Sequence, residues 1–454
     1  MTPEIPTTAA VTAAIEAQQA RILADLTELV SFNSVHGEPD CKQANADAAA
    51  WVVHALEDVG LTVEPHPTTD GSTAVIGRRE AHDGRPTVLL YSHYDVVPAG
   101  SPAAWTSDPF TLTERDGRWY GRGTADCKGN LVMHLATLRA LRELGDPGIG
   151  IIVVIEGSEE KGGEGLDALI SERPELFTAD AIIIADTGNV AEGVPTLTTS
   201  LRGGAQLRVT VRTLRSAVHS GGFGGPAPDA VSALIRILDS LRDESGRVAI
   251  RATDNTATWN GIAYDPDAFR ADAGILDGVE IIGDGTDIAD QLWARPAVTV
   301  TGFTSTPVAE AMNAIPATAS AQLNLRTPYG ASGTGTAEAL RRHLLDAAPW
   351  GAQVDVEILE VNEPFATDTS GPAAQALADA LSKAFGDKET AYCGSGGSIP
   401  LTTALQQAVP GAEIALFGVE EPLCTIHSAN ESVSPEELKR CAVAETLFLF
   451  NYTA

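Results

Sequence analysis

Cysteine is scarce and scattered in this chain. The 454 residues contain five cysteines, an odd number, and no two of them form a CxxC pair. This pattern provides neither a disulfide framework nor a thiolate zinc site of the usual spacing. We therefore expect a protein of the reducing cytoplasm.

Basic residues and long apolar runs are also scarce. Lys and Arg number 30 against 61 Asp and Glu, which gives a net charge of -31. Such a charge repels nucleic acid and anionic membranes, so neither is an expected partner. No apolar run approaches the roughly 18–20 residues of a membrane helix. The first 20 residues lack the basic start and unbroken apolar core of a signal peptide.

The chain contains no internal repeat and no low-complexity tract, and its length predicts two or three domains. Segments 12–30 and 44–59 have apolar residues at helical spacing and contain neither Gly nor Pro at their centres. Helices alternating with strands buried on both faces indicate an α/β fold with a helix-covered, mostly parallel sheet. Four short apolar runs predict those buried strands, at residues 87–92, 149–155, 181–185 and 413–417.

The middle of the chain has a different pattern. Residues 205–213 and 319–326 alternate polar and apolar side chains, which is typical of half-buried antiparallel strands. We therefore predict an α+β domain at residues 201–362. It is inserted into a catalytic domain formed by residues 1–200 and 363–454.

A histidine and a carboxylate follow the first predicted strand. His93 and Asp95 are two residues apart, and such positions share one face of a strand. Asp95 is therefore placed to fix the tautomer of His93, as carboxylates do for metal-bound imidazoles. Taken alone, the pair is explained more simply as an ordinary His–Asp pair at a strand end.

Glycine-rich segments surround three further carboxylates. Asp126 stands directly before a predicted helix, where it is equally consistent with an N-cap. Glu159 and Glu160 follow the second strand, and adjacent carboxylates there are costly without a cation or solvent. One of them can bind a metal while the other acts as a general base on water. An acidic surface loop is the alternative.

The fourth and fifth ligand types also follow predicted strands. Asp186 comes after the third strand and His427 some residues after the fourth. Active sites of open α/β sheets lie at the carboxyl ends of the strands. We therefore predict a site for two divalent ions, most simply Zn, with Mn or Co also suited to the donors. Its ligands are His93, Asp126, Glu160, Asp186 and His427.

Two glycine-rich loops lie outside this set. His219 stands in the sequence VHSGGFGG, which favours a functional loop at least as much as a plain turn. Ser398 stands in GSGGSIP, which is equally consistent with an anion-binding nest and a flexible loop. The other six histidines lack such settings and are expected to be surface or packing residues.

Taken in order, these segments resemble a known family that covers nearly the whole chain. The family comprises the di-zinc exopeptidases and deacylases, including carnosinase-like dipeptidases, aminoacylases and succinyl-diaminopimelate desuccinylase. Each motif is weak alone, but the ordered set is highly specific. The motifs are SHYDVVP, YGRGTADCKGN, EGSEEKGGEG, the Asp186 strand end, HSGGFGG, NAIPA, GGSIP and IHSANE.

The resemblance implies the metal chemistry. Asp126 would bridge two metals. His93 and Asp186 would complete the ligands of one metal, and Glu160 and His427 those of the other. The roles of the neighbouring residues follow from the same resemblance. They are Glu159 as the general base for a metal-bridging water, Asp95 as the residue that orients His93, and a cis Asp126–Cys127 peptide bond.

The resemblance also implies substrate contacts and a partner. His219 would reach the active site of a second subunit and stabilise the oxyanion. Asn313, Arg326 and Ser398 match substrate-binding positions, with Arg326 holding the substrate's C-terminal carboxylate through paired hydrogen bonds. The inserted domain matches a lid and dimerisation domain, so we expect a homodimer.

Within the family, the chain most resembles the carnosinase-like metallodipeptidases. Its long 251–292 segment, expected to form irregular loops, and its Asp at position 186 carry that resemblance. The expected activity is hydrolysis of dipeptides. The alternatives are an N-acyl-amino-acid deacylase and an inactive relative that binds metal or peptide. An inactive relative would lack a ligand or Glu159, and none is missing.

Overall fold

The computed structural model describes residues 5–283, 285–397 and 399–452. The chain divides into two compact units. The first contains the chain up to Thr199, Thr367–Cys393 and the chain from Pro400 onward. The second contains Ser200–Ala366 and Gly394–Ile399.

The first unit is built on a nine-stranded sheet with a parallel centre. Strands β6 (Gly150–Glu156), β3 (Thr87–His93), β7 (Ala181–Ala185) and β17 (Glu413–Phe417) lie side by side in that order, all parallel. Every residue of β6 and β7 is buried, which explains their continuous apolar sequences. The other strands of this sheet are β1 (Thr62–Pro67), β2 (Thr73–Arg79), β8 (Thr196–Leu201), β15 (Phe365–Ala366) and β16 (Ala391–Ser395). Of these, β15 and the last residues of β8 and β16 fall in the residue ranges of the second unit.

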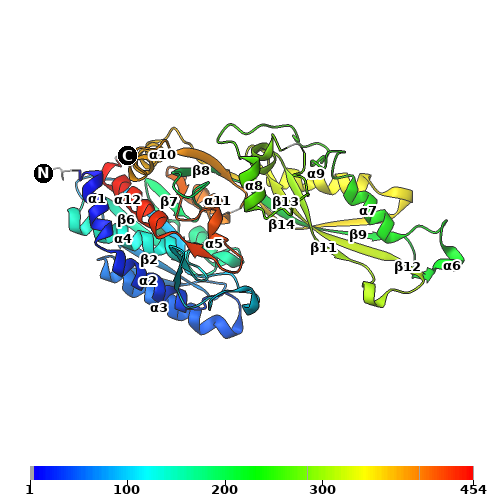
Figure 1. Cartoon of the computed structure of the whole chain (residues 1–454), viewed down its shortest axis with the longest axis horizontal. Helices are drawn as coiled ribbons and strands as arrows, with labels where there is room; N and C mark the ends of the chain where they lie inside the picture. The colour runs from blue at the N-terminus through cyan, green and yellow to red at the C-terminus, as the bar shows by residue number, and fades with distance from the viewer. Residues whose placement is uncertain (1–4, 284, 398, 453–454) are drawn as a thin grey trace. The chain divides into compact units, whose positions relative to one another are not determined.

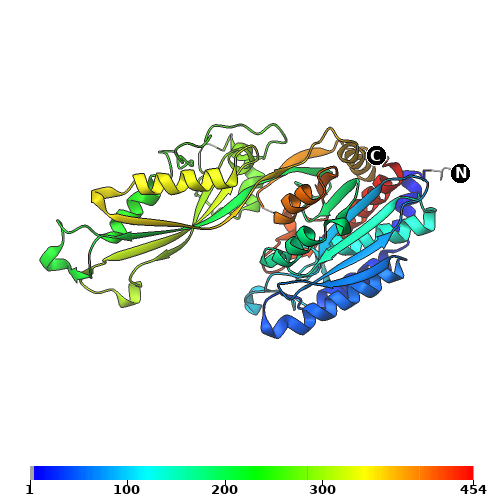
Figure 2. The same cartoon turned by 180° about the vertical axis from the view of Figure 1, so that it is seen from behind.

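Helices cover both faces of this sheet. Figures 1 and 2 show α1, α2, α4 and α12 over one face and α5 and α11 over the other. The predicted α/β class with a helix-covered, mostly parallel sheet is confirmed. The helices of this unit are α1 (Thr8–Glu16), α2 (Gln19–Ser31), α3 (Lys42–Asp58), α4 (Lys128–Leu144), α5 (Glu164–Glu172), α10 (Pro372–Ala384), α11 (Pro400–Ala408) and α12 (Pro435–Asn451).

The segment 12–30 is two helices, not the single helix predicted. The first helix ends at Glu16, and the second begins at Gln19. Gln18 lies at the break, where its side-chain amide donates to the carbonyl oxygens of Ala14 and Ala136. The second of these bonds reaches α4, so the break coincides with a long-range contact. No Gly or Pro marks the break in the sequence.

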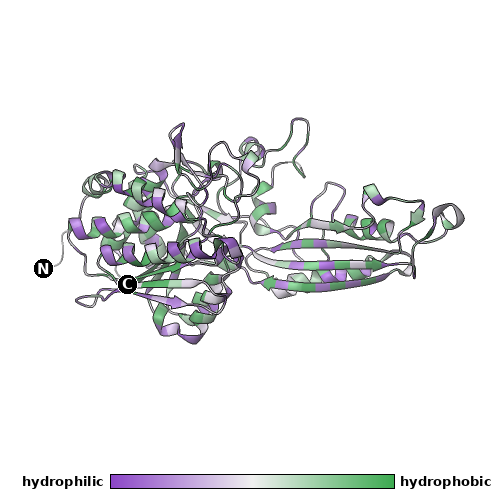
Figure 3. Ribbon diagram, turned by 90° about the horizontal axis from the view of Figure 1, so that it is seen from below, coloured by the Kyte–Doolittle hydropathy of each residue, from purple (hydrophilic) through white to green (hydrophobic). Residues whose placement is uncertain are grey.

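The second unit contains a four-stranded antiparallel sheet in the order β11-β13-β9-β14. Along β9 and β13 buried residues alternate with less buried ones, and Figure 3 shows the matching bands of hydropathy. The buried face packs against α7 and α9. The elements are α7 (Ala230–Asp239), α9 (Gly333–Asp346), β9 (Gly203–Arg212), β11 (Ala297–Thr304), β13 (Thr318–Thr327) and β14 (Gln353–Asn362).

The segment 251–292 was expected to form irregular loops, and this prediction is wrong in part. It contains helix α8 (Pro266–Asp272). The Asp265 side chain accepts hydrogen bonds from the backbone N–H groups of Asp267 and Ala268, and Pro266 occupies the first turn. These are standard signals for a helix start, and the surrounding Asp, Gly and Thr content concealed them.

Candidate active site

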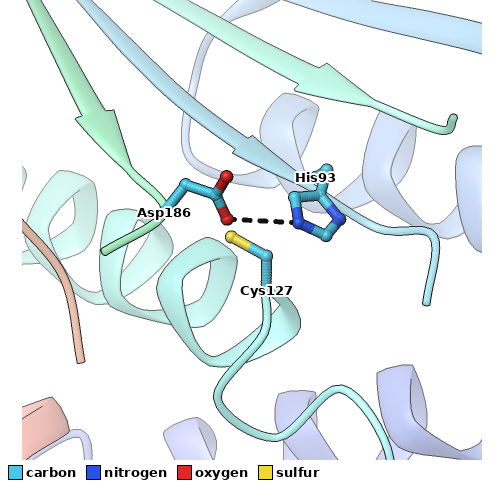
Figure 4. A group of neighbouring side chains, drawn as sticks. All are labelled: His93, Cys127 and Asp186. Carbon is cyan, nitrogen blue, oxygen red and sulfur yellow. Dashed lines mark ion pairs between the residues drawn. The ribbon is translucent and has the colours of Figure 1, made fainter. Parts of the chain in front are cut away.

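The central strands of the first unit deliver polar side chains to one edge of the sheet. His93 is the last residue of β3, and Asp186 directly follows β7. Because β3 and β7 are parallel neighbours, their carboxyl ends lie together. The His93 Nε2 lies 3.2 Å from Asp186 Oδ1, and both side chains are buried (Figure 4).

Asp126 lies between the two predicted histidine ligands. Its Oδ1 is 3.1 Å from His93 Nε2, and its Oδ2 is 3.0 Å from His427 Nε2. The same His427 nitrogen is 3.1 Å from Glu160 Oε2. The five residues predicted as metal ligands therefore come together. Asp126 offers one oxygen to each side, as a carboxylate bridging two ions does.

A buried ion pair holds the Asp126 loop in place. Glu431 Oε2 accepts from Arg122 Nη1 at 2.7 Å and from the Gly123 N–H at 2.9 Å. Its Oε1 accepts from the N–H groups of Ala125 and Asp126. The segment is also fixed by a small sheet, and the predicted cis Asp126–Cys127 peptide bond is present. The strands of that sheet are β4 (Thr113–Arg115), β5 (Arg118–Tyr120) and β18 (Ser432–Val433).

The loop that carries His427 has an unusual backbone. Thr425, His427 and Asn430 have φ angles of 49°, 60° and 62°, a left-handed region that costs energy for residues other than glycine. Such conformations persist where the surrounding structure enforces them, often at functional sites. Here Asn430 anchors the loop, since its side chain accepts from the Thr106 N–H at 2.8 Å and donates to the Ala104 carbonyl at 3.0 Å.

Asp95 links His93 to the neighbouring glutamates. The His93 Nδ1 lies 3.1 Å from the Asp95 carbonyl oxygen and 3.3 Å from Oδ1, so its Nε2 faces the other carboxylates. The Asp95 carboxylate also accepts from the N–H groups of Glu159 and Glu160, each at 3.1 Å. One carboxylate thus orients the imidazole and fixes the turn that presents both glutamates.

The electrostatics of the cluster favour a bound cation. Burial, followed by the charge of Asp186, raises the pKa of Glu159 well above its usual value. Burial also raises the pKa of Glu160 to about 7. Hydrogen bonds to Asp126 and then Glu160 raise the pKa of His427 to about 11. Burial and neighbouring carboxylates both oppose further negative charge on the glutamates, so a bound cation would stabilise their ionised forms.

The donor chemistry fits divalent metal ions. Within the described part of the chain, Glu160 Oε1 is buried and has no hydrogen-bond partner, as expected of an oxygen reserved for an ion. The mixed imidazole and carboxylate donors suit Zn, Mn or Co. Three overlapping groups have ligand atoms close enough to share an ion. They are His93 with Asp126 and Glu160, His93 with Cys127 and Asp186, and Asp126 with Asp186 and Glu420.

Glu420 is a member of this cluster that the sequence analysis missed. It follows β17 by three residues, and its carbonyl oxygen accepts from the Asn189 N–H at 2.7 Å. A Cβ atom on Gly188 would lie 2.0 Å from that oxygen, so only glycine permits the close approach. The rule that selected Asp186, a carboxylate after a buried strand, also applies to Glu420.

The second unit holds the other predicted residues. His219 is exposed in the two-stranded β10–β12 ribbon, formed by Val218–His219 and Ala314–Ile315, which leads into α6 (Ser220–Phe223). Its Nδ1 accepts from the Gly222 N–H at 3.1 Å, which leaves Nε2 as the proton donor. Asn313 lies beside it, since its carbonyl accepts from the Ser220 N–H at 2.9 Å.

Arg326 lies near the end of β13, and the predicted Ser398 lies outside the described residues. Burial and then the charge of Arg326 lower the pKa of Arg202 to about 10. The two guanidinium groups are therefore close enough to interact, and Glu360 lies near Arg326. Guanidinium groups bind carboxylates through paired hydrogen bonds. The backbone N–H of Arg202 donates to the carbonyl oxygen of Ser395, in the glycine-rich loop, at 3.3 Å. Arg202 was not predicted, because no local pattern distinguishes it.

The chain is similar to several dipeptidases over most of its length. The chain is 54% identical over 434 residues to a cysteinylglycine-S-conjugate dipeptidase of Corynebacterium striatum, covering 95% of each protein. It is 25% identical over 456 residues to a Cys-Gly metallodipeptidase of Candida albicans, covering 92% of each. Its fold matches that of human carnosine dipeptidase 1 with a TM-score of 0.81 at 23% identity, over 98% of this chain and 99% of the other.

A model of one peptidase family matches most of the chain. The match runs over residues 89–451 and includes every residue of the candidate metal cluster. Among the described residues, no helix has both the length and the apolar content required to cross a membrane. The chain therefore belongs to peptidase family M20/M25/M40.

Proposed function

We propose that this protein is a metal-dependent dipeptidase. The observation that carries the proposal is the convergence of two histidines on opposite oxygens of Asp126, at 3.1 and 3.0 Å, beside Glu159. The 54% identity to a dipeptidase over 95% of both chains supports the same activity.

Two divalent ions, most simply zinc, would be held by the five predicted ligands. When bound, they would polarise the scissile carbonyl and activate water. Asp126 would bridge them, His93 and Asp186 would hold one, and Glu160 and His427 the other. Glu159 is placed to serve as the general base. Its Oε2 lies 3.9 Å from His93 Nε2, beside the proposed ligands, and among the described contacts His427 pairs with Asp126 and Glu160 but not with Glu159. It would take the proton from water and return it to the leaving amine.

The substrates we propose are dipeptides with a free C-terminus. S-substituted cysteinylglycines are the first to test, because the relative from Corynebacterium striatum is named as a dipeptidase of such conjugates. Arg326, with Arg202 as its neighbour, would bind the substrate carboxylate through paired hydrogen bonds. Ser398 remains a proposed substrate contact, and Asn313, which lies beside His219, would contact the substrate together with that histidine.

We also propose a homodimer in which His219 acts on the partner's substrate. His219 lies beside Asn313, five residues before β13 begins, whereas Arg326 lies at the other end of that ten-residue strand. At about 3.3 Å per residue, the two positions are roughly 30 Å apart. One dipeptide cannot contact both, so a second copy would supply the histidine that stabilises the oxyanion.

The cytoplasm is the location we propose. All five cysteines are free thiols, and four of them are buried. A reducing compartment maintains this state.

A substrate panel tests the proposed activity. Purified protein would be assayed with S-benzyl-cysteinylglycine, unsubstituted dipeptides, the same dipeptides carrying an N-acetyl group, and N-acyl amino acids. A dipeptidase hydrolyses the first two classes and discriminates against the acetylated forms. Hydrolysis of N-acyl amino acids instead would assign the chain to the deacylases. A lack of hydrolysis of all classes in protein shown to contain metal would contradict enzymatic activity.

A further inference from the structure

Cys127 is a buried thiol among the proposed metal ligands. Its side chain has no exposed surface. Its sulfur, a His93 ring nitrogen and an Asp186 oxygen all lie within 4.8 Å of one another. Figure 4 shows the sulfur beside the Asp186 carboxylate oxygen that faces the His93 imidazole. The sulfur therefore lies within reach of an ion held by His93 and Asp186.

Neighbouring groups hold the sulfur in this place. The thiol donates to the Ala185 carbonyl at 3.0 Å, and the Asn130 side-chain amide lies 3.5 Å from the sulfur. Ala185 directly precedes Asp186, so the sulfur is fixed to the same strand end as the carboxylate ligand. A simple packing residue needs only an apolar contact, but this sulfur is directed to the edge where the ligands converge.

We propose that Cys127 is an additional ligand of the metal site formed by His93, Asp126 and Asp186, and that it biases this site toward thiophilic ions. The set would supply one nitrogen, two oxygens and one sulfur as donors. Thiolate donors favour Zn²⁺ and Cd²⁺, whereas Mn²⁺ prefers oxygen. The inference rests on the proposed metal ligands but does not depend on which bond the enzyme cleaves.

The binding step involves a simple exchange. A sulfur–metal bond forms, the S–H bond breaks, and the proton passes to the buffer. The hydrogen bond from the thiol to Ala185 is lost in the same step. No electron is transferred, so no oxidant or reductant is required.

Charge-transfer absorption tests the proposal directly. The metal-free full chain would be titrated with Co²⁺ and, separately, with Cd²⁺ while the near-ultraviolet spectrum is recorded. We expect an intense sulfur-to-metal band in the wild type that is absent from Cys127→Ser. The matched control is Cys424→Ser, another buried thiol, which hydrogen-bonds to Glu421 and should leave the band intact. Circular dichroism checks that each variant is folded.

Metal competition provides the second readout. Loss of the thiol should reduce the preference for Cd²⁺ over Mn²⁺ at least tenfold, measured by metal analysis after equilibrium dialysis. X-ray absorption of the wild-type zinc protein does not require a variant to fold, and we expect a sulfur scatterer in its first coordination shell. A shell of nitrogen and oxygen alone, or a band that persists in folded Cys127→Ser, would overturn the inference.

The outcome is independent of the proposed function. Dipeptide hydrolysis without a sulfur-to-metal band would overturn the role of Cys127 alone. A band that disappears in Cys127→Ser, in a protein that cleaves no dipeptide, would support the ligand and contradict the proposed activity.

Discussion

The two units of the molecule present their polar residues in different ways. In the first, strands buried on both faces end together, and histidines and carboxylates from different strands and loops lie within about 3 Å of one another. In the second, buried residues alternate with less buried ones along β9 and β13, so the polar groups are spread along one face of the sheet. A parallel sheet therefore concentrates reactive groups, whereas the antiparallel sheet spaces them apart. The proposed metal ligands and Glu159 all belong to the first unit, and the proposed contacts Asn313 and Arg326 belong to the second.

The sharpest test of this difference is Glu159→Gln in the first unit. Because the amide cannot accept a proton, we expect kcat to fall by about 10³–10⁴-fold. Bound metal should be unchanged, because Glu159 is not a proposed ligand. The matched control is Glu172→Gln, an exposed glutamate at the end of α5. Wild-type turnover in Glu159→Gln would contradict its role as the base.

Removal of the bridging carboxylate should affect both metals together. In the wild type, each Asp126 carboxylate oxygen faces a histidine. Asp126→Asn replaces one of these oxygens with an amide nitrogen, which is a poor metal ligand, so we expect metal content to fall from about two ions to less than one. Native mass spectrometry and elemental analysis measure the stoichiometry. Retention of two ions at wild-type affinity would show that Asp126 does not bridge them.

A residue of the second unit should affect turnover but not metal. We expect His219→Ala to lower kcat by about 10²–10³-fold, because it removes one oxyanion donor. Mixing this variant with Glu159→Gln tests action across a dimer, since each mixed dimer regains one complete site. Random mixing should restore roughly a quarter of wild-type activity. Absence of complementation in verified mixed dimers would place His219 in its own subunit's site.

Metal binding should depend on pH with a defined sign. The pKa of Glu160 is raised to about 7 and that of His427 to about 11, so both bind protons in the metal-free protein near neutral pH. Metal binding must displace those protons, and apparent affinity should therefore rise as pH increases from 6 to 8. Calorimetry in buffers of different ionisation enthalpy measures the protons released. An affinity independent of pH would contradict this coupling.

A buried carboxylate behind the site should have a smaller effect, on stability alone. Burial raises the pKa of Glu156 from 4.5 to about 8, and the Tyr91 hydroxyl donates to it at 2.7 Å. The folded state thus binds more protons than the unfolded state between these values. Its contribution is present below about pH 4.5 and is lost as pH rises through about 8.

Glu156→Gln should remove this dependence while keeping an acceptor for Tyr91. Denaturant unfolding of the chelated proteins from pH 5 to 9 would measure the difference. We expect the free energy of unfolding of the wild type to fall relative to the variant by up to about 1.4 kcal/mol per pH unit. Parallel pH profiles for the two proteins would refute the assignment.

The sequence revealed the parts of the fold that depend on local pattern. Strands β7 and β17 have the predicted bounds, because short apolar runs of this kind have few other solutions. The break between α1 and α2 was missed because it accompanies a contact to Ala136, more than one hundred residues away.

The candidate site shows the same division. His93 and Asp186 follow recognisable buried strands, so their proximity could be anticipated. Glu431 acts through bonds to Gly123 and Asp126, about three hundred positions earlier, and no spacing in the sequence connects them. Long-range contacts of this kind become visible only in the folded chain.

The central claim is metal-dependent hydrolysis of dipeptides, and stoichiometric reconstitution tests it most directly. Chelated protein would be titrated with Zn²⁺ or Mn²⁺ while hydrolysis of S-benzyl-cysteinylglycine is followed. We predict no activity without metal and a rise to a plateau near two ions per chain, as expected for a two-metal site. Full hydrolysis by metal-free protein, or none at any metal content, would contradict the claim.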